Sequence, residues 1–281
     1  MCEFCHKHGE GKKWYLEAKN YSDDLLSDLN RSKFIEQFFS HVPSAGDLSR
    51  AEEKLENSPP LIRGIVKRLA LRKQKKVHYG QVLPVEDVER ILEFVNSVVR
   101  ISCICRYLNL GKEKRYCYGI SLSPDGGKFG ELLRNVATNP SAPPAFKHSE
   151  KLSKEEAIAA FRSHEHEGLC HTVWTFNTPF IGGLCNCDRS DCLAMRYTVT
   201  HDFPMMFRAE YVGAVDPDLC SGCRECMRVC QFGAISYSPS DKKTRIDAKH
   251  CYGCGVCRAL CKKDAIRLVD RMSVPFAAKR W

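Results

Sequence analysis

Two stretches near the C-terminus decide the fold of that part of the chain: Cys220-Ser221-Gly222-Cys223-Arg224-Glu225-Cys226-Met227-Arg228-Val229-Cys230 and Cys251-Tyr252-Gly253-Cys254-Gly255-Val256-Cys257-Arg258-Ala259-Leu260-Cys261. Both read C-x-x-C-x-x-C-x-x-x-C. The match continues beyond the cysteines, because each copy has a glycine before its second cysteine and an Ala-Ile pair after its last, at Ala234-Ile235 and Ala265-Ile266. We infer that a whole folding unit is duplicated.

This spacing is typical of sites for [4Fe-4S] clusters, in which four thiolates converge on one cube of iron and sulfide. Gaps of two residues let three sulfurs wrap one side of a cube, and Gly222 and Gly253 ease the tight turns. The spacing then lets the last cysteine of each copy cross over to the cluster of the other copy. The two sites are therefore expected to interlock.

The segment from about residue 211 to residue 270 resembles the bacterial two-cluster ferredoxins. The resemblance implies one cluster on Cys220, Cys223, Cys226 and Cys261, and a second on Cys251, Cys254, Cys257 and Cys230. It also implies electron transfer as the function. The family usually has proline after the fourth cysteine, whereas Gln231 and Lys262 stand there, so rigidity and water access near these sulfurs are expected to differ.

Zinc is the main alternative to iron in this segment. Zinc sites usually use paired C-x-x-C units, so the third equally spaced cysteine in both copies would have no purpose. Pro239, Ser240 and Asp241 separate two short runs of strand-forming residues and predict a hairpin turn, which agrees with the small ferredoxin fold. We therefore favour iron.

Nine further cysteines lie outside the duplicated unit. Six of them form two tight groups, and we interpret them as a pool of ligands for a third iron-sulfur cluster: Cys103, Cys105, Cys117, Cys185, Cys187 and Cys192. Zinc or buried free thiols are the alternatives for this pool. The stretch from Gly168 to Cys192 is loosely similar to anaerobe four-iron ferredoxin-type proteins, in which C-x-C-Arg precedes a Cys-Asn-Cys loop. Cys170 stands alone and is expected to be a core residue.

The N-terminal string Cys2-Glu3-Phe4-Cys5-His6 matches C-x-x-C-H, the attachment motif for c-type haem. We disfavour haem, because its attachment normally occurs outside the cytoplasm and no export signal precedes Cys2. Zinc held with His6 and His8, or ligands lent to a cluster, fits Cys2 and Cys5 better. A disordered, reactive terminus is an equal alternative.

Composition favours a cytoplasmic metalloprotein. The 281 residues include 17 cysteines, an odd number that cannot all form intramolecular disulfides, and no secretory signal or run of 18 apolar residues is visible. The formal charge of +9 falls to about +5 if two clusters each add roughly −2. This charge suits an acidic redox partner, is too mild to indicate nucleic acid, and is compatible with a peripheral membrane complex.

The predicted fold class is α+β. Residues 1–209 are expected to be mostly helical with a cysteine-rich loop module and a third metal centre, and residues 210–281 to form a ferredoxin-like two-cluster domain. Ser22 predicts a helix N-cap, Pro84 the start of a core helix, and Ser153 with Glu156 a capping box.

The leading functional hypothesis is an electron carrier, or a subunit of an oxidoreductase, that passes electrons through two or three clusters between a donor and a partner. The runner-up is a reductase in which Cys170, His171 or an unligated iron acts on a small substrate. A redox-sensing regulator with a basic helix at residues 61–76 ranks third. No G-x-G-x-x-G or P-loop motif supports a nucleotide site.

Overall fold

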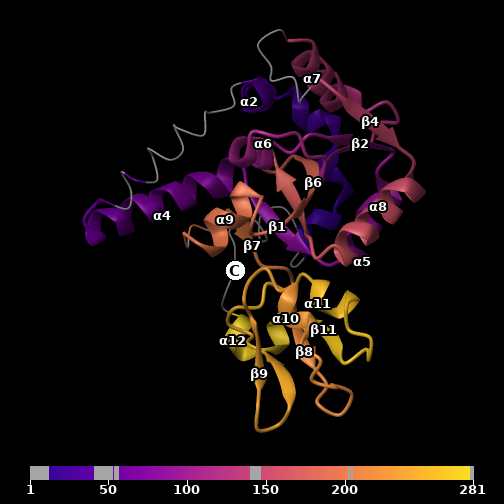
Figure 1. Ribbon diagram of the computed structural model, residues 1–281. Helices are drawn as coiled ribbons and strands as arrows, with labels where there is room; N and C mark the ends of the chain where they lie inside the picture. Colours follow the sequence, from indigo (N-terminus) through magenta and orange to yellow (C-terminus); the bar gives the residue numbers. More distant parts are fainter. Residues whose placement is uncertain are drawn as a thin grey trace.

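The N-terminal part of the chain is built on a seven-stranded sheet (Figure 1). In this computed structural model, the described residues are 13–40, 53, 57–139, 147–201, 203 and 205–278. The strand order is β4-β2-β3-β6-β5-β1-β7, and neighbouring strands are antiparallel except for the parallel pair β1 and β7. The strands are β1 (Gly80–Leu83), β2 (Ser97–Ile101), β3 (Cys117–Ser121), β4 (Ser149–Leu152), β5 (Cys170–Thr175), β6 (Ile181–Cys187) and β7 (Met206–Phe207).

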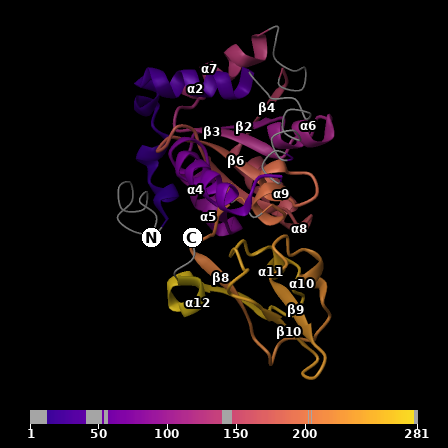
Figure 2. The ribbon, with the colours of Figure 1, turned by 90° about the vertical axis from the view of Figure 1, so that its left-hand side faces the viewer.

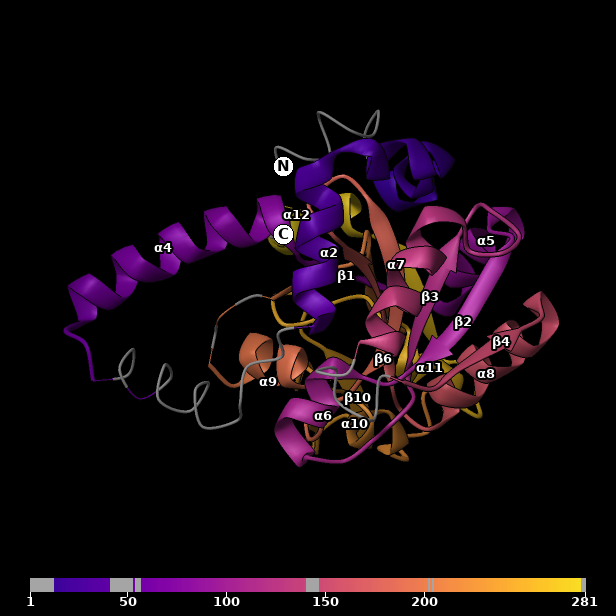
Figure 3. The ribbon, with the colours of Figure 1, turned by 90° about the horizontal axis from the view of Figure 1, so that it is seen from above.

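Helices pack against this sheet and enclose two aromatic-rich cores (Figure 3). The first core contains Val173 and Leu184 with residues of α5 and α8, and the second contains Phe129 and Phe176 with residues of α2 and α7. The helical segments before residue 208 are η1 (Trp14–Leu16), η2 (Ala18–Tyr21), η3 (Asp23–Ser27), α2 (Leu29–Ser40), α4 (Pro60–Val77), α5 (Val85–Phe94), α6 (Ile104–Leu110), α7 (Gly127–Thr138), α8 (Lys154–His166) and α9 (Leu193–Val199).

The α+β class expected from the sequence is confirmed, but the N-terminal region contains a sheet where mostly helix and cysteine-rich loops were expected. All six residues of β5 are buried, as are six of the seven residues of β6. A strand buried on both faces shows no alternation of polar and apolar residues, so its period cannot be recognised in the sequence. The cysteines in β3, β5 and β6 therefore lie on strands.

The sequence patterns at helix ends predicted the structure better than the patterns of the strands did. The Ser22 side chain accepts a hydrogen bond from the backbone N–H of Asp24, and Ser153 and Glu156 form the predicted capping box. Pro84 occupies the N-cap of α5 rather than its first helical position. Caps depend on contacts between near neighbours, which explains why the sequence predicts them well.

After β7 the chain forms two small two-stranded sheets (Figure 2). β8 (Tyr211–Val215) pairs with β11 (Ile266–Asp270), and β9 (Ile235–Ser238) pairs with β10 (Lys243–Ile246) across the predicted hairpin turn. The short helices of this part are α10 (Glu225–Arg228), α11 (Val256–Ala259), η5 (Arg271–Ser273) and α12 (Pro275–Ala278). The pairing of β8 with β11 brings the two ends of the duplicated unit together.

Helix α4 projects from the body of the protein and buries none of its residues (Figures 1 and 3). Leu61, Ile65 and Leu69 lie on one side of it and are between 53% and 80% exposed. The helix carries seven basic and no acidic side chains. Among the described residues, no helix is long and apolar enough to cross a membrane.

A buried ion pair fastens η5 to the residue before β8. Arg271, 5% exposed, donates to a carboxylate oxygen of Glu210 at 2.9 Å, and Glu210 is only 2% exposed. The backbone N–H of Arg271 also donates to the carbonyl oxygen of Glu210 at 3.0 Å. The pair lies beside Gln81 of β1, whose amide nitrogen is 3.5 Å from the Glu210 carboxylate.

We expect Arg271→Met to lower the free energy of unfolding by about 3 to 5 kcal/mol, because Glu210 would keep a buried charge without its partner. Arg245→Met is the matched control, since Arg245 makes an exposed ion pair with Asp241 and its loss should change stability little. Thermal unfolding followed by circular dichroism compares the two variants. Equal effects would contradict a structural role for the buried pair.

Candidate metal centres

The duplicated unit presents its cysteines from tight loops that require glycine. Gly222 and Gly253 have positive φ angles of 69° and 71°. A Cβ atom at Gly222 would collide with the carbonyl oxygen of Lys242, and one at Gly253 with that of Tyr211. The first loop therefore lies against the turn before β10 and the second against β8, and no larger residue fits at either turn.

Backbone and side-chain groups point at these sulfurs. The N–H groups of Ala234 and Ala265 each donate to the last cysteine of their own copy, Cys230 and Cys261, at 3.3 Å. The N–H of Gly213 donates to Cys251 at 3.3 Å, and the Thr244 hydroxyl lies 3.4 Å from Cys220 and 3.7 Å from Cys226. Hydrogen bonds to a thiolate stabilise its negative charge, so these sulfurs are prepared for ligation.

The fold brings the eight sulfurs together as two groups. Burial raises the pKa of Cys226, and the neighbouring Cys223, Cys220 and Cys261 raise it further. Burial likewise raises the pKa of Cys257, with Cys254, Cys251 and Cys230 as the next contributors. The last cysteine of each copy therefore lies close enough to the other copy to raise the pKa of a cysteine there, and Cys230 and Cys261 pack in one cluster with Cys226 and Cys257.

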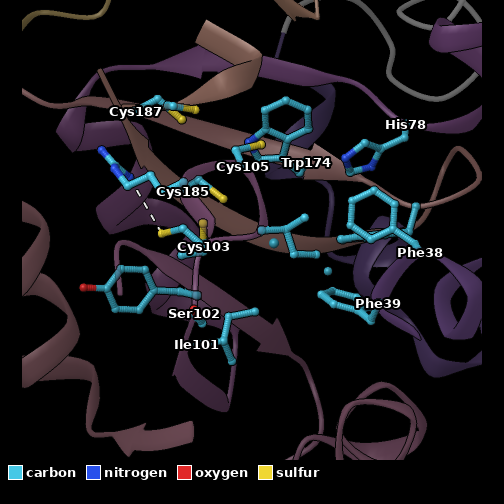
Figure 4. Close-up of a pocket in the computed structure, with 18 of the residues that line it drawn as sticks. Phe38, Phe39, His78, Ile101, Ser102, Cys103, Cys105, Trp174, Cys185 and Cys187 are labelled. Carbon is cyan, nitrogen blue, oxygen red and sulfur yellow. Dashed lines mark hydrogen bonds between the residues drawn. The ribbon is translucent and has the colours of Figure 1, made fainter. Parts of the chain in front are cut away.

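The six cysteines of the proposed pool line a single cavity in the N-terminal part (Figure 4). They come from four places in the chain: the start of α6 for Cys103 and Cys105, β3 for Cys117, β6 for Cys185 and Cys187, and the start of α9 for Cys192. Cys117 and Cys185 face each other across the β3–β6 pair. We call this cavity the six-cysteine pocket.

Within the six-cysteine pocket the thiols form two sets of three. Cys117 is in hydrogen-bonding contact with Cys103 and Cys185, and Cys192 with Cys105 and Cys187. Donation from Cys105 and Cys187 holds the pKa of Cys192 well below its usual range. Contact with Cys192 and burial have the opposite effect on Cys105 and Cys187, whose pKa values are raised.

The positively charged guanidinium of Arg106 lies buried beside these sulfurs. Arg106 is 2% exposed and donates to the carbonyl oxygen of Asn186 at 2.9 Å, to Cys103 at 3.7 Å and to the carboxylate of Asp188. Burial lowers its pKa, but the nearby Cys187, Cys103 and Asp188 outweigh that effect and raise it. Arg106 therefore keeps its positive charge beside the pocket.

The sequence identified the six cysteines but gave no role to Arg106 or Asp188. The sequence could have indicated these two residues, because Arg106 directly follows Cys105 and Asp188 directly follows Cys187. Their pairing across 82 residues is a tertiary contact that spacing alone cannot show. Cys170 is fully buried, as expected of a core residue. Cys2 and Cys5 lie outside the described residues.

Among the residues that the structure describes, no group of three or more His, Cys, Asp or Glu side chains is arranged to hold a single metal ion. This holds for the six-cysteine pocket and for the duplicated unit alike. A single zinc ion needs all its sulfurs at about 2.3 Å, whereas an iron-sulfur cube presents a separate iron to each thiolate.

The comparisons with known proteins agree with the duplicated unit. Residues 219–265 match the family of 4Fe-4S dicluster domains. This match shows that the segment is a ferredoxin-type iron-sulfur domain. No curated protein is similar enough to the chain to match it.

His78, which also lines the six-cysteine pocket, makes stability depend on pH. Its ring lies against Phe38 and Trp174 at 4.5 Å and 4.9 Å between centroids, and burial lowers its pKa to about 4 although Nδ1 contacts the carbonyl oxygen of Thr175. The unfolded chain, with a histidine pKa of about 6.5, binds the proton more readily. Stability from neutral His78 is therefore complete above pH 6.5 and is lost as the pH falls towards 4.

We expect the protein to lose about 2 kcal/mol of stability through this group between pH 7 and pH 5, and His78→Phe to remove that dependence. The measurement is urea unfolding at both pH values under anaerobic conditions. The control is His250→Gln, which changes an exposed histidine outside the six-cysteine pocket. An unchanged slope in His78→Phe would contradict the assignment.

Proposed function

We propose that this protein is an electron-transfer protein or subunit that passes electrons through two [4Fe-4S] clusters in its C-terminal part and a third cluster in the six-cysteine pocket. The match to 4Fe-4S dicluster domains supports an iron-sulfur electron-transfer role. The observation that carries the proposal is the meeting of eight cysteines in two groups, each completed by the last cysteine of the other copy. When bound, each cluster would accept and release one electron.

The proposed ligand sets follow these groups. Cys220, Cys223, Cys226 and Cys261 would hold the first cluster, and Cys230, Cys251, Cys254 and Cys257 the second. The chain supplies N–H and hydroxyl donors to both groups, and such donors shift reduction potentials towards more positive values by stabilising the reduced, more negative state.

The six-cysteine pocket fits a third cluster in charge as well as in ligand number. Four thiolates are needed for one cube, and six sulfurs line the pocket. Thiolates crowded at this density repel one another unless a cation is near, and Arg106 lies within reach of Cys103. Buried free thiols alone would give no reason to bury an arginine and an aspartate beside them.

We divide the chain at about residue 209, with the six-cysteine pocket before it and the two-cluster domain after it. The partner is proposed to be a redox protein with an acidic docking surface, and the compartment the cytoplasm. Cys223 is the one exposed cysteine among those described. Arg228 and Lys242, near it in the two-cluster domain, are exposed and basic. This surface suits electrostatic docking of an acidic partner.

Anaerobically purified protein should contain about twelve irons per chain, four for each cluster. The double variant Cys185→Ser, Cys187→Ser should retain about eight, because the two-cluster domain does not use these cysteines. Val173→Ala, a change on the neighbouring strand that faces the other core, is the control and should retain the full number. Zinc in place of iron, or eight irons in the parent protein, would remove the third cluster.

Charge near Cys223 should govern electron exchange with charged reagents. In the variant Arg228→Glu, Lys242→Glu, oxidation of the reduced protein by ferricyanide should slow at low salt, and oxidation by hexaamminecobalt(III) should quicken. Both differences should vanish at high ionic strength, because exposed charges are screened. Lys73→Glu on α4 is the control. Equal rates in all three proteins would place the exit of electrons elsewhere.

A further inference from the structure

Cys170 lies between the two sulfur-rich regions. It is the first residue of β5, its exposed fraction is 0%, and it faces Cys187 of the six-cysteine pocket across the β5–β6 pair. Its thiol donates to the carbonyl oxygen of His171 at 3.7 Å, and its side chain belongs to the packed cluster that Cys254 of the two-cluster domain joins. Cys192 and Cys230 are also close enough to interact with it electrostatically. Among the described cysteines, Cys170 is the one that belongs to neither the six-cysteine pocket nor the duplicated unit.

A side chain next to a proposed cluster ligand holds the two regions together. Gln231, which stands where the ferredoxin pattern usually has proline, donates to the carbonyl oxygen of Gly168 at 2.8 Å. Its amide oxygen accepts a hydrogen bond from the N–H of Arg189 at 2.9 Å. Gly168 leads into Cys170, and Arg189 lies in the loop between Cys187 and Cys192. A proline side chain could make neither bond.

The contact around Cys170 is packed and dry. Phe232 stacks on Tyr252 with 4.0 Å between ring centroids, and the guanidinium of Arg208 lies 4.5 Å above the Tyr252 ring. One apolar cluster runs without interruption from Cys192 through Cys170 to Cys254. Electron transfer between two centres is helped by a short path through packed atoms and by exclusion of water, which limits solvent reorganisation.

Cys170 is poorly placed to act as a nucleophile. Its neighbour His171 points to the opposite face of the strand, where the ring packs on Phe161 with 5.5 Å between centroids. The Nδ1 atom of His171 is bonded to Asn186 at 2.6 Å. A base that faces away from the thiol cannot take its proton.

We propose that Cys170 is the sulfur link between the six-cysteine pocket and the cluster group that contains Cys254. With a cluster bound, the thiol would donate a hydrogen bond to the Cys254 thiolate, against which it packs, and its sulfur would provide the step by which an electron crosses between the two regions. The crossing is outer-sphere, so one centre loses an electron, the other gains it, and no bond forms or breaks. The electron path rests on the third cluster proposed above, whereas the hydrogen bond to Cys254 does not.

The position of Cys170 also sets the order in which electrons would pass through the three proposed clusters. The group of Cys230, Cys251, Cys254 and Cys257 lies next to Cys170, and the group that contains the exposed Cys223 lies beyond it. Electrons from a docked partner would therefore enter or leave at the Cys223 group and reach the six-cysteine pocket last. Gln231 acts here as a positioning residue, because it keeps the two regions in register.

The test compares Cys170→Ala with Cys170→Ser in the full-length, anaerobically loaded protein. In Cys170→Ala we expect parent iron content, a more negative potential for one ferredoxin-type cluster in redox-titrated EPR, and severalfold slower electron equilibration between that cluster and the third after a laser-induced reducing pulse. Cys170→Ser keeps a donor to Cys254, so its potential should stay near the parent value while equilibration remains slower.

Gln231→Leu provides a second route that leaves every cysteine in place. It should slow equilibration without changing iron content, whereas Lys262→Leu, the same change at the corresponding exposed position of the second copy, should behave as the parent. Parent potentials and parent equilibration in Cys170→Ala would overturn the proposal. Eight irons in the parent would remove the third cluster and the electron path, and a potential shift in Cys170→Ala would then still support the hydrogen bond to Cys254.

Discussion

The rest of this structure depends on keeping many cysteine sulfurs close together inside the protein. Thiolates at short range repel one another, and burial further disfavours their charge. In one region the N–H groups of Ala234, Ala265 and Gly213 donate to the sulfurs. In the other region the Arg106 guanidinium does so. These groups stabilise the thiolate charge that metal ligation requires.

The two regions assemble their sulfurs in different ways. In the duplicated unit, each group of three cysteines comes from one short loop, and only one sulfur must arrive from the other copy. In the six-cysteine pocket, the sulfurs come from two strands and two helix starts that are up to 89 residues apart, from Cys103 to Cys192. The seven-stranded sheet is therefore the scaffold of the pocket, because the β3–β6 pair places Cys117 against Cys185.

Two residues, Gln231 and Cys170, have a clear place in the structure only when the contact between the two regions is considered. Gln231 departs from the proline of the ferredoxin pattern, and its amide bonds both Gly168 and the loop before Cys192. Cys170 has no place in either ligand set, and it packs in the cluster that Cys254 joins. Both residues lie at the contact between the two regions.

The sequence by itself determined the parts that depend on near neighbours. The ferredoxin-type segment, its two tight glycine turns, its hairpin, and the helix caps at Ser22 and Ser153 could all be predicted, because spacing and local backbone geometry define them. The α+β class could also be predicted, although the sheet itself could not, since its buried strands show no periodic pattern.

Only the tertiary structure decided which distant residues meet. It joined the six cysteines in one pocket, paired Arg106 with Asp188, left α4 without a buried face, and placed Cys170 between two sulfur groups. These contacts arise from strand pairing and from burial over long stretches of chain. Residue spacing in the sequence does not predict these contacts, because the free energy that favours them comes from the packing of the whole core.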